Sequence, residues 1–282
     1  MKFITFYRLF YRHRFLKASI FLKIYLIIIL PIRYFFNIFY LQKKINLDVY
    51  QKKFEHLYDY DLDKLFEYFN SDKGEYFLNQ YVQPIKKNLN KIKGHGYSKL
   101  YEKIFLNLKE KSIEVLELGS FYGNASAALF FYFKNAKIFS GDINPDMFRY
   151  SSERVKNFYV DTGSRDSINN NIVNNKMSYD FIIEDASHML KDQIISLFIL
   201  FPLIKSGGFF IVEELDFPET REDMRINQDP PNLKQILLNV ISNKDFQSKY
   251  ISDDEKKYFL NNFASVQIEK GNFHQIAIIK KK

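Results

Sequence analysis

The sequence predicts an α/β protein built on an open, mostly parallel β-sheet, with additional helices on its N-terminal side. Between residues 113 and 212, short apolar strand candidates alternate with segments of helical periodicity, which is the pattern of parallel strands joined by crossover helices. Acidic residues and a histidine directly follow two of these strand candidates. Ligands of open parallel sheets bind at the carboxyl ends of the strands, so we expect a functional site at this edge.

The 282 residues suffice for one large α/β domain with an appendage, which we favour over two small domains. The chain contains no cysteine, which excludes a disulfide, a thiolate nucleophile and a Cys-ligated zinc site, and fits a reducing compartment. The formal net charge is +8, yet residues 1–47 hold nine Lys or Arg and no acid. The rest of the chain is therefore nearly neutral, which argues against a nucleic-acid partner.

Residues 1–45 form a basic and aromatic segment that we expect to lie on an anionic membrane surface. The longest uncharged run, residues 24–32, is shorter than the about 20 residues that a bilayer span needs. Any span would include Lys23 or Arg33, and Pro31 lies where a signal-peptide cleavage site would need small residues. This interpretation predicts a cytoplasmic protein, peripheral at the inner face of the cell membrane. The alternatives are packing on the body, a homo-oligomer contact and a true span.

Residues 46–110 are predicted to form a helical N-terminal cap. Its clearest elements are an amphipathic helix over 57–70 and a second helix over 99–109. Two polar loops, Asn70 to Gly74 and Gly94 to Tyr97, are either a lid over a pocket or ordinary helix connections.

A strand, a glycine-bearing turn and a helix follow at 113–116, 117–123 and 124–133. Gly119 and Gly123 allow the backbone to approach a ligand beside the free N–H groups of the helix start. The next strand, 137–140, leads to Asp142, which could accept hydrogen bonds from both hydroxyls of a ribose or cap the next helix. Together these features favour an adenosine-containing ligand. A third strand candidate, 158–160, ends at Asp161.

The metal-site candidates follow two strands, 181–183 and 209–212, which a helix over 190–204 connects. They are Asp185 and His188 after the first strand, and Glu213 and Glu214 after the second. Three carboxylates and an imidazole suggest a hard metal ion with a base beside it. The alternative is a structural histidine and two solvated glutamates. Beyond them we expect a mobile loop over 216–231, a helix over 233–241 and a closing hairpin of strands 264–269 and 274–279.

Four motifs occur in order along the chain. They are residues 71–74 (SDKG) with 95–102 (HGYSKLYE), the glycine turn 115–123, residues 184–188 (EDASH) and residues 212–215 (VEEL). Together they resemble the class I S-adenosylmethionine (SAM)-dependent methyltransferases, and more narrowly the magnesium-dependent sugar O-methyltransferases of the macrocin and mycinamicin type, with cephalosporin-hydroxylase-like proteins as relatives. The first motif resembles that family's TDKG and HxYTxxYE leader, the second matches its cofactor turn, the third its DDGSH and the fourth its IEDL. The resemblance covers roughly residues 70 to 280.

The resemblance implies a Rossmann-like domain over residues 111–282, with a seven-stranded, mostly parallel sheet and an antiparallel C-terminal hairpin. It implies that Asp185, Glu213 and Glu214 bind Mg²⁺ and that His188 is the general base. The residues that would hold SAM are Glu117, Gly119, Ser120, Gly123, Asp142, Asp161 and Tyr97. Two departures are notable: Glu214 replaces the family's Asp, and residues 161–164 do not reproduce its GDQSD.

The implied activity is SAM- and Mg²⁺-dependent transfer of a methyl group to a sugar hydroxyl. An imidazole of pKa about 6.5 cannot deprotonate such a weak acid unaided, so Mg²⁺ on the sugar oxygens would stabilise the developing alkoxide. The membrane segment adds the hypothesis that the acceptor is a cell-surface polysaccharide or glycolipid intermediate. The alternatives are a methyltransferase or hydroxylase-like enzyme on a non-sugar molecule, and a non-catalytic, membrane-docked glycan-assembly factor.

Overall fold

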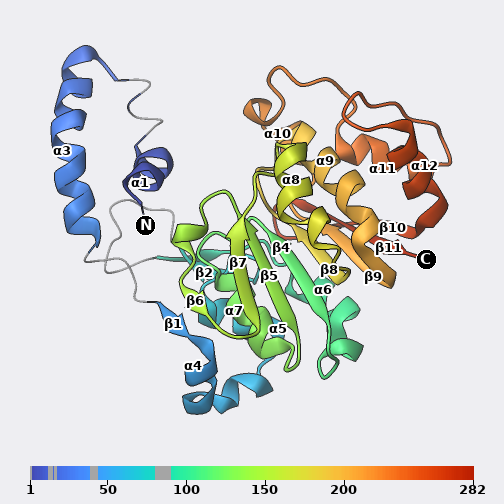
Figure 1. Ribbon diagram of the computed structural model, residues 1–282, viewed down its shortest axis with the longest axis horizontal. Helices are drawn as coiled ribbons and strands as arrows, with labels where there is room; N and C mark the ends of the chain where they lie inside the picture. Colours follow the sequence, from blue (N-terminus) through green and yellow to red (C-terminus); the bar gives the residue numbers. More distant parts are fainter. Residues whose placement is uncertain (1, 12–14, 16–17, 39–43, 80–89) are drawn as a thin grey trace.

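The computed structural model describes residues 2–11, 15, 18–38, 44–79 and 90–282 (Figure 1). Its body is organised around one seven-stranded sheet of strand order β10-β11-β9-β8-β4-β5-β7. The strands are β4 (Glu114–Leu118), β5 (Lys137–Asp142), β7 (Val155–Tyr159), β8 (Tyr179–Glu184), β9 (Ile204–Val212), β10 (Phe263–Lys270) and β11 (Gln275–Lys281). The five strands from β9 to β7 run parallel, whereas β11 pairs antiparallel with both β9 and β10. The predicted sheet and C-terminal hairpin are confirmed.

Helices cover both faces of this sheet. One layer contains α5 (Leu62–Phe69), α6 (Ser98–Phe105) and α7 (Asn124–Tyr132), and the other α8 (Arg165–Asn171), α9 (Leu190–Leu200), α11 (Leu233–Ile241) and α12 (Asp253–Asn262). In β8, Phe181 and Ile183 pack into the first layer and Ile182 into the second, because successive side chains of a strand alternate between faces. A strand buried on both faces therefore appears in the sequence as a continuous apolar run.

The helix predicted over 190–204 is shorter than expected. It ends at Leu200 and passes through a 3₁₀ turn into β9, which already begins at Ile204. Pro202 explains the difference, because a proline inside a helix lacks the N–H donor and clashes with the preceding turn. The helix predicted over 233–241 is confirmed as α11. The sequence reasoning missed α12, although Ser252 and Glu255 form a capping box at its start.

In its described residues, 46–79 and 90–110, the predicted helical cap contains short strands as well as helices, and residues 80–89 lie outside the described residues. Besides α4 (Leu47–Lys53), α5 and α6, two short strand pairs involve it. These pairs are β1 (Ile45–Asn46) with β6 (Tyr150–Ser151) and β2 (Tyr76–Leu78) with β3 (Lys91–Lys93). The helix predicted from Leu57 begins at Leu62, because the Asp61 side chain accepts a hydrogen bond from the Lys64 N–H and caps it there. Since α5 and α6 share a hydrophobic core with α7 and the sheet, this region is part of the helical layer.

Six 3₁₀ helices complete the described secondary structure of the body, together with the short helix α10 (Phe217–Thr220). They are η1 (Glu55–Asp59), η2 (Leu106–Leu108), η3 (Pro145–Met147), η4 (Val173–Asn175), η5 (Phe201–Leu203) and η6 (Glu222–Met224). The stretch 216–231 therefore contains α10 and η6, and its mobility remains a prediction.

Among the described residues of the N-terminal segment are the helices α1 (Phe3–Phe10) and α3 (Ile20–Ile38), which pack against each other beside the body (Figure 1). The Lys2 N–H and the Thr5 hydroxyl donate to the Asp146 carboxylate of the body. Phe21 and Ile28 of α3 are 81% and 64% exposed. Within the described part of the chain, no helix is both long and apolar enough to cross a membrane. Residues 1, 12–14, 16–17 and 39–43 of the predicted membrane-surface segment lie outside the described residues.

Candidate active site

A cavity of about 410 Å³ opens at the carboxyl ends of the parallel strands. Each of four strands places an acid in its wall: Glu117 from β4, Asp142 from β5, Asp185 after β8 and Glu214 after β9. The remaining charged or aromatic lining includes Asp72, Lys73, His95, His188, Phe217 and Arg221. The sheet therefore gathers these groups at one edge, as expected for an open parallel sheet.

The two polar loops before the sheet domain lie together over this cavity. The His95 N–H donates to the Asp72 carbonyl at 2.6 Å, and the Tyr97 N–H donates to the Lys73 carbonyl at 2.8 Å. These backbone bonds make the loops one paired unit that contributes Lys73 and His95 to the cavity lining. Of the two roles left open by the sequence, this arrangement favours a cover over a pocket rather than ordinary helix connections.

The glycine turn after β4 brings the backbone very close to the neighbouring strand end. Gly119 has φ +84°, and a Cβ added there would lie 1.9 Å from the Asp185 carbonyl oxygen. No other residue fits this position without moving the backbone. The Asp142 carboxylate accepts hydrogen bonds from the N–H groups of Phe121 and Asn144, at 2.8 and 2.7 Å. Burial raises the pKa of Asp142, whereas these backbone donors lower it.

The predicted cofactor residues divide into three groups by position. Those that line the large cavity are Glu117, Gly119, Ser120 and Asp142. Asp161 lines a smaller cavity of about 120 Å³, which shares Gly119 and Asp142 with the large one. Gly123 and Tyr97 line neither cavity. Gly123 precedes α7 with φ +79°, and Tyr97 is fully buried with its ring stacked on His95, the centroids 5.5 Å apart.

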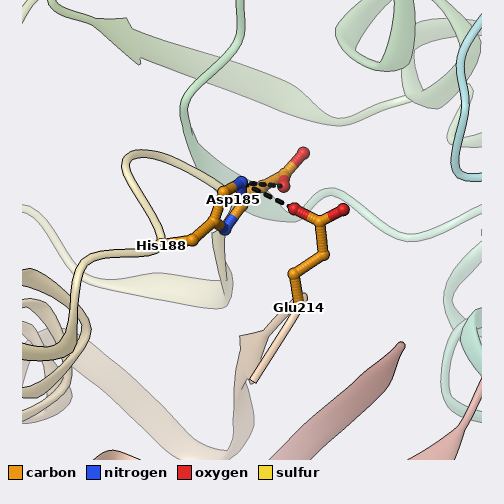
Figure 2. A group of neighbouring side chains, drawn as sticks. All are labelled: Asp185, His188 and Glu214. Carbon is orange, nitrogen blue, oxygen red and sulfur yellow. Dashed lines mark ion pairs between the residues drawn. The ribbon is translucent and has the colours of Figure 1, made fainter. Parts of the chain in front are cut away.

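Asp185, His188 and Glu214 form a cluster that could hold a metal ion. Figure 2 shows their side chains pointing toward one another, and one ligand atom from each lies within 4.8 Å of the others. His188 Nε2 lies 2.7 Å from Glu214 Oε2 and 3.7 Å from Asp185 Oδ1. His95 Nε2 lies 3.1 Å from the other oxygen of Glu214. Carboxylate oxygens with an imidazole are a donor set for a hard or borderline divalent cation.

Glu213 does not join this cluster in the structure. Its carboxylate accepts hydrogen bonds from Lys73 Nζ at 2.8 Å and from the Tyr101 hydroxyl, and Lys73 Nζ also lies 2.5 Å from Asp185 Oδ2 and 3.9 Å from Glu117 Oε1. Lys73 and Glu213 are both buried. A lysine thus occupies the space between two of the three predicted metal ligands. The assignment of Glu213 to the metal stays a prediction.

Backbone strain is concentrated at this site. His188 and Glu214 have φ of +55° and +49°, and Phe121 in the glycine turn has φ +46°. Non-glycine residues adopt this left-handed conformation at a cost of about 1–3 kcal/mol each, which the surrounding structure must offset. Such positions occur preferentially at functional sites. Two of the strained residues, His188 and Glu214, belong to the cluster that could hold a metal ion.

The charges of the cluster are mutually compensated. Burial lowers the pKa of His188, but the nearby carboxylates of Glu214 and Asp185 have the larger effect and raise this pKa to about 9. Burial raises the pKa of Glu214, but His188 and His95 lower it to about 2. Burial likewise disfavours the charge on Lys73, and Asp185 and Glu213 hold its pKa well above its usual value. Without a metal, His188 therefore keeps its proton at neutral pH.

The sequence reasoning did not assign roles to Lys73, His95 or Tyr101, although all three lie within the recognised leader motifs. Their place within the two leader motifs, residues 71–74 and 95–102, is the one sequence signal that could have indicated a role for them. Lys73 is separated by 112 residues from Asp185 and by 140 from Glu213, so no local pattern reports their contact. Phe217 and Arg221 come from the stretch that was predicted as a mobile loop.

No protein-family model matches the chain. Two curated relatives from Streptomyces olivaceus are similar to it. The 3'-O-methyltransferase of 8-demethyl-8-(2-methoxy-alpha-L-rhamnosyl)-tetracenomycin C is 28% identical over 130 residues, covering 43% of this chain and 32% of the relative. The 2'-O-methyltransferase of 8-demethyl-8-alpha-L-rhamnosyl-tetracenomycin C is 26% identical over 128 residues, covering 43% and 33%. The chain spans about a third of the length of these relatives.

Among solved structures, the chain is similar to MycE, a methyltransferase of the mycinamycin biosynthetic pathway, in complex with Mg and SAH. The TM-score is 0.58 at 18% identity, covering 79% of this chain and 55% of that chain. The complex of MycE with Mg, SAH and mycinamycin VI gives 0.57 at 17%, covering 79% and 54%. The fold is therefore that of the class I SAM-dependent methyltransferases. Within that class, the comparisons confirm the resemblance to sugar O-methyltransferases that the motifs predicted.

Proposed function

We propose that this chain is a SAM- and Mg²⁺-dependent O-methyltransferase that transfers a methyl group to a sugar hydroxyl. The observation that carries the proposal is a single cavity with two chemically different walls. One wall is the glycine turn with Asp142, and the other is the cluster of Asp185, His188 and Glu214. The similarity to rhamnosyl O-methyltransferases supports a sugar acceptor.

The cluster fits Mg²⁺ by its donor chemistry. Mg²⁺ is commonly bound by one or two carboxylates together with oxygens of water or substrate. Asp185 and Glu214 would supply the carboxylates, whereas Glu213, the third ligand predicted from the sequence, is held by Lys73 and Tyr101. When bound, the ion would act as a Lewis acid toward the acceptor hydroxyl. Two carboxylate ligands leave the imidazole of His188 available for the proton.

His188 would act as the general base. It lines the cavity beside the two carboxylates, and its Nδ1 is buried without a hydrogen-bond partner, so Nε2 is the nitrogen placed to accept the hydroxyl proton. Asp185 and Glu214 stabilise the protonated form of His188. His188 must therefore lose this proton before it can accept one from the acceptor hydroxyl. General-base action of this kind contributes roughly 10²- to 10⁴-fold to the rate.

On the opposite wall, Gly119 and Ser120 would allow the cofactor to approach the backbone, and Asp142 would accept hydrogen bonds from the ribose. Asp161 would lie near the adenine, because it lines the smaller cavity that continues from Asp142. Glu117 would line the cofactor's part of the cavity, where the hydrogen bond from Ser126 at 2.5 Å fixes its carboxylate. The two remaining predicted cofactor residues would act less directly, Gly123 by shaping the turn and Tyr97 by supporting His95.

We also propose that the protein acts at the inner face of the cell membrane on a cell-surface polysaccharide or glycolipid intermediate. Support comes from the exposed apolar side chains of α3, such as Phe21 and Ile28, and from nine basic and no acidic residues in 1–47. An amphipathic, basic surface of this kind favours binding to anionic lipid. Alternatively, the exposed apolar face of α3 packs against a second copy of the chain, and the protein would then be a dimer in solution.

The first test is SAM binding to the 282-residue chain by calorimetry, with Mg²⁺ and with EDTA, followed by methyl transfer to methyl rhamnoside. We expect SAM to bind, and Asp185→Asn to abolish transfer while the fold and SAM affinity are retained. Transfer to a non-sugar hydroxyl alone would support the alternative enzyme. A folded protein that binds no SAM in either condition would contradict the proposal and favour a non-catalytic assembly factor.

A matched pair of variants tests the ligand set. Glu213→Gln and Glu214→Gln make the same chemical change at adjacent positions, one held by Lys73 and one in the metal cluster. We expect Glu214→Gln to weaken Mg²⁺ binding strongly and Glu213→Gln to weaken it little, measured by calorimetry on the folded proteins. Equal losses would show that Glu213 also binds the ion.

A further inference from the structure

A second cavity of about 320 Å³ lies beside the active-site cavity, between β1, α4, the end of α5 and β6. Its lining residues include three tyrosines, Tyr50, Tyr68 and Tyr150, together with Arg149. None of its eight lining residues, all of them within the described ranges, carries a negative charge, and Arg149 carries a positive one. We call this space the arginine cavity.

The two cavities share a wall. Asn124 lines both, and its side-chain oxygen accepts a hydrogen bond from the Tyr150 hydroxyl at 3.3 Å. The Arg149 guanidinium lies 3.5 Å from the ring centroid of Tyr122, and Tyr122 lines the active-site cavity. One layer of side chains thus separates the two spaces, so groups bound in the two cavities would be close neighbours.

The two cavities differ in the charges that line them. The active-site cavity combines the cations Lys73, His188 and Arg221 with five carboxylates, those of Asp72, Glu117, Asp142, Asp185 and Glu214. Lys73 and His188 are already paired with Asp185 and Glu214, so an anionic group of the acceptor would have to compete with these carboxylates there. The arginine cavity offers such a group a half-buried guanidinium, whose charge is retained at any physiological pH and whose planar donors match carboxylate and phosphate oxygens.

We propose that the arginine cavity is a second acceptor subsite, which binds a carboxylate or phosphate on the unit next to the methylated sugar. This inference rests on the proposed sugar O-methyltransferase function and narrows its acceptor to an anionic glycan. Tyr50 and Tyr68, whose hydroxyls are hydrogen-bonded to each other at 2.6 Å, together offer one further O–H donor to the same space. Arg149 binds the anionic group, while Asp185, His188 and Glu214 act on the methylated sugar in the adjacent active-site cavity.

The test titrates glucuronate, inorganic phosphate and glucose into the 282-residue chain and measures binding by ligand-observed NMR. We expect at least one anion to bind about tenfold or more tighter than glucose, because charge-assisted hydrogen bonds are about twice as strong as neutral ones. Arg149→Met should remove this preference. Arg221→Met is the matched control, because it removes the same charge from the active-site cavity and should leave anion binding unchanged. Preference for glucuronate identifies a uronic acid, and preference for phosphate identifies a phosphorylated acceptor.

Two further variants cover the case in which Arg149→Met does not fold. Arg149→Lys keeps the charge but loses the planar fork, and Tyr68→Phe removes one hydroxyl from a 40% exposed ring. Each should weaken anion binding by roughly threefold or more without changing SAM affinity. Normal SAM binding with no anion binding that depends on these residues would overturn the subsite alone. Absence of SAM binding would overturn the proposed function and the subsite together.

Discussion

Lys73→Met tests whether a buried lysine neutralises the acidic cluster. Lys73 Nζ contacts Asp185 at 2.5 Å and Glu213 at 2.8 Å, and its side chain is only 3% exposed. Methionine fills a similar volume but carries no charge. The substitution therefore removes the cation and leaves two carboxylates facing each other in a site with little water.

The expected loss of stability follows from this geometry. Removing one partner of a buried ion pair costs about 3–5 kcal/mol, because the other charge stays buried without compensation. Burial already raises the pKa of Glu213 to about 8, although Lys73 opposes that shift. Glu213 can therefore take up a proton when the lysine is gone, which places the expected loss near the lower limit, about 3 kcal/mol. For a domain of this size, that loss lowers the Tm by roughly 6–12 °C.

The assay is urea unfolding at pH 7 in EDTA, followed by circular dichroism. Lys64→Met is the matched control, because Lys64 is 66% exposed and lies 3.6 Å from Asp61, so its loss should cost less than about 1 kcal/mol. Adding Glu213→Gln to Lys73→Met should recover part of the loss, since it removes one uncompensated carboxylate. A Lys73→Met protein as stable as the Lys64→Met control would refute the role of Lys73 as the counter-charge.

Three further predictions concern other parts of the molecule. Gly119→Ala should cost more than about 1 kcal/mol in urea unfolding and impair SAM binding, because its Cβ would lie 1.9 Å from the Asp185 carbonyl oxygen; wild-type behaviour would contradict the tight turn. Burial raises the pKa of Glu255, but its hydrogen bonds from Arg165, at 2.8 and 2.9 Å, bring it below the usual value. The stabilisation by Glu255 is therefore present above the unfolded pKa of about 4.3 and is lost as the pH falls through the lower folded value. Glu255→Gln should thus destabilise the protein at pH 7 but hardly at pH 3, and an equal effect at both pH values would exclude a charge effect. Phe21→Ser should reduce co-sedimentation with anionic vesicles and leave SAM binding intact; unchanged co-sedimentation would show that the exposed face of α3 does not contact lipid.

The sequence by itself determined the parts of the fold that depend on local pattern. Strands buried on both faces appear as apolar runs, so the runs near 115, 182 and 210 became β4, β8 and β9 at the centre of the sheet. Because parallel strands end at one edge, the polar residues after these runs also indicated the site. Asp185, His188 and Glu214 lie together as that rule required.

Only the tertiary structure decided how those groups are partnered. Glu213 and Glu214 are adjacent in sequence, yet Glu213 is held by Lys73 and Tyr101 and Glu214 by two histidines. The turn at Glu214, with φ +49°, separates the directions of the two side chains, and a sequence pattern cannot report that backbone conformation. The arginine cavity likewise joins residues from β1, α4, α5, α7 and β6 that share no motif. Periodicity reports which face of its own element a residue occupies, whereas a contact between distant elements depends on the packing of the whole chain.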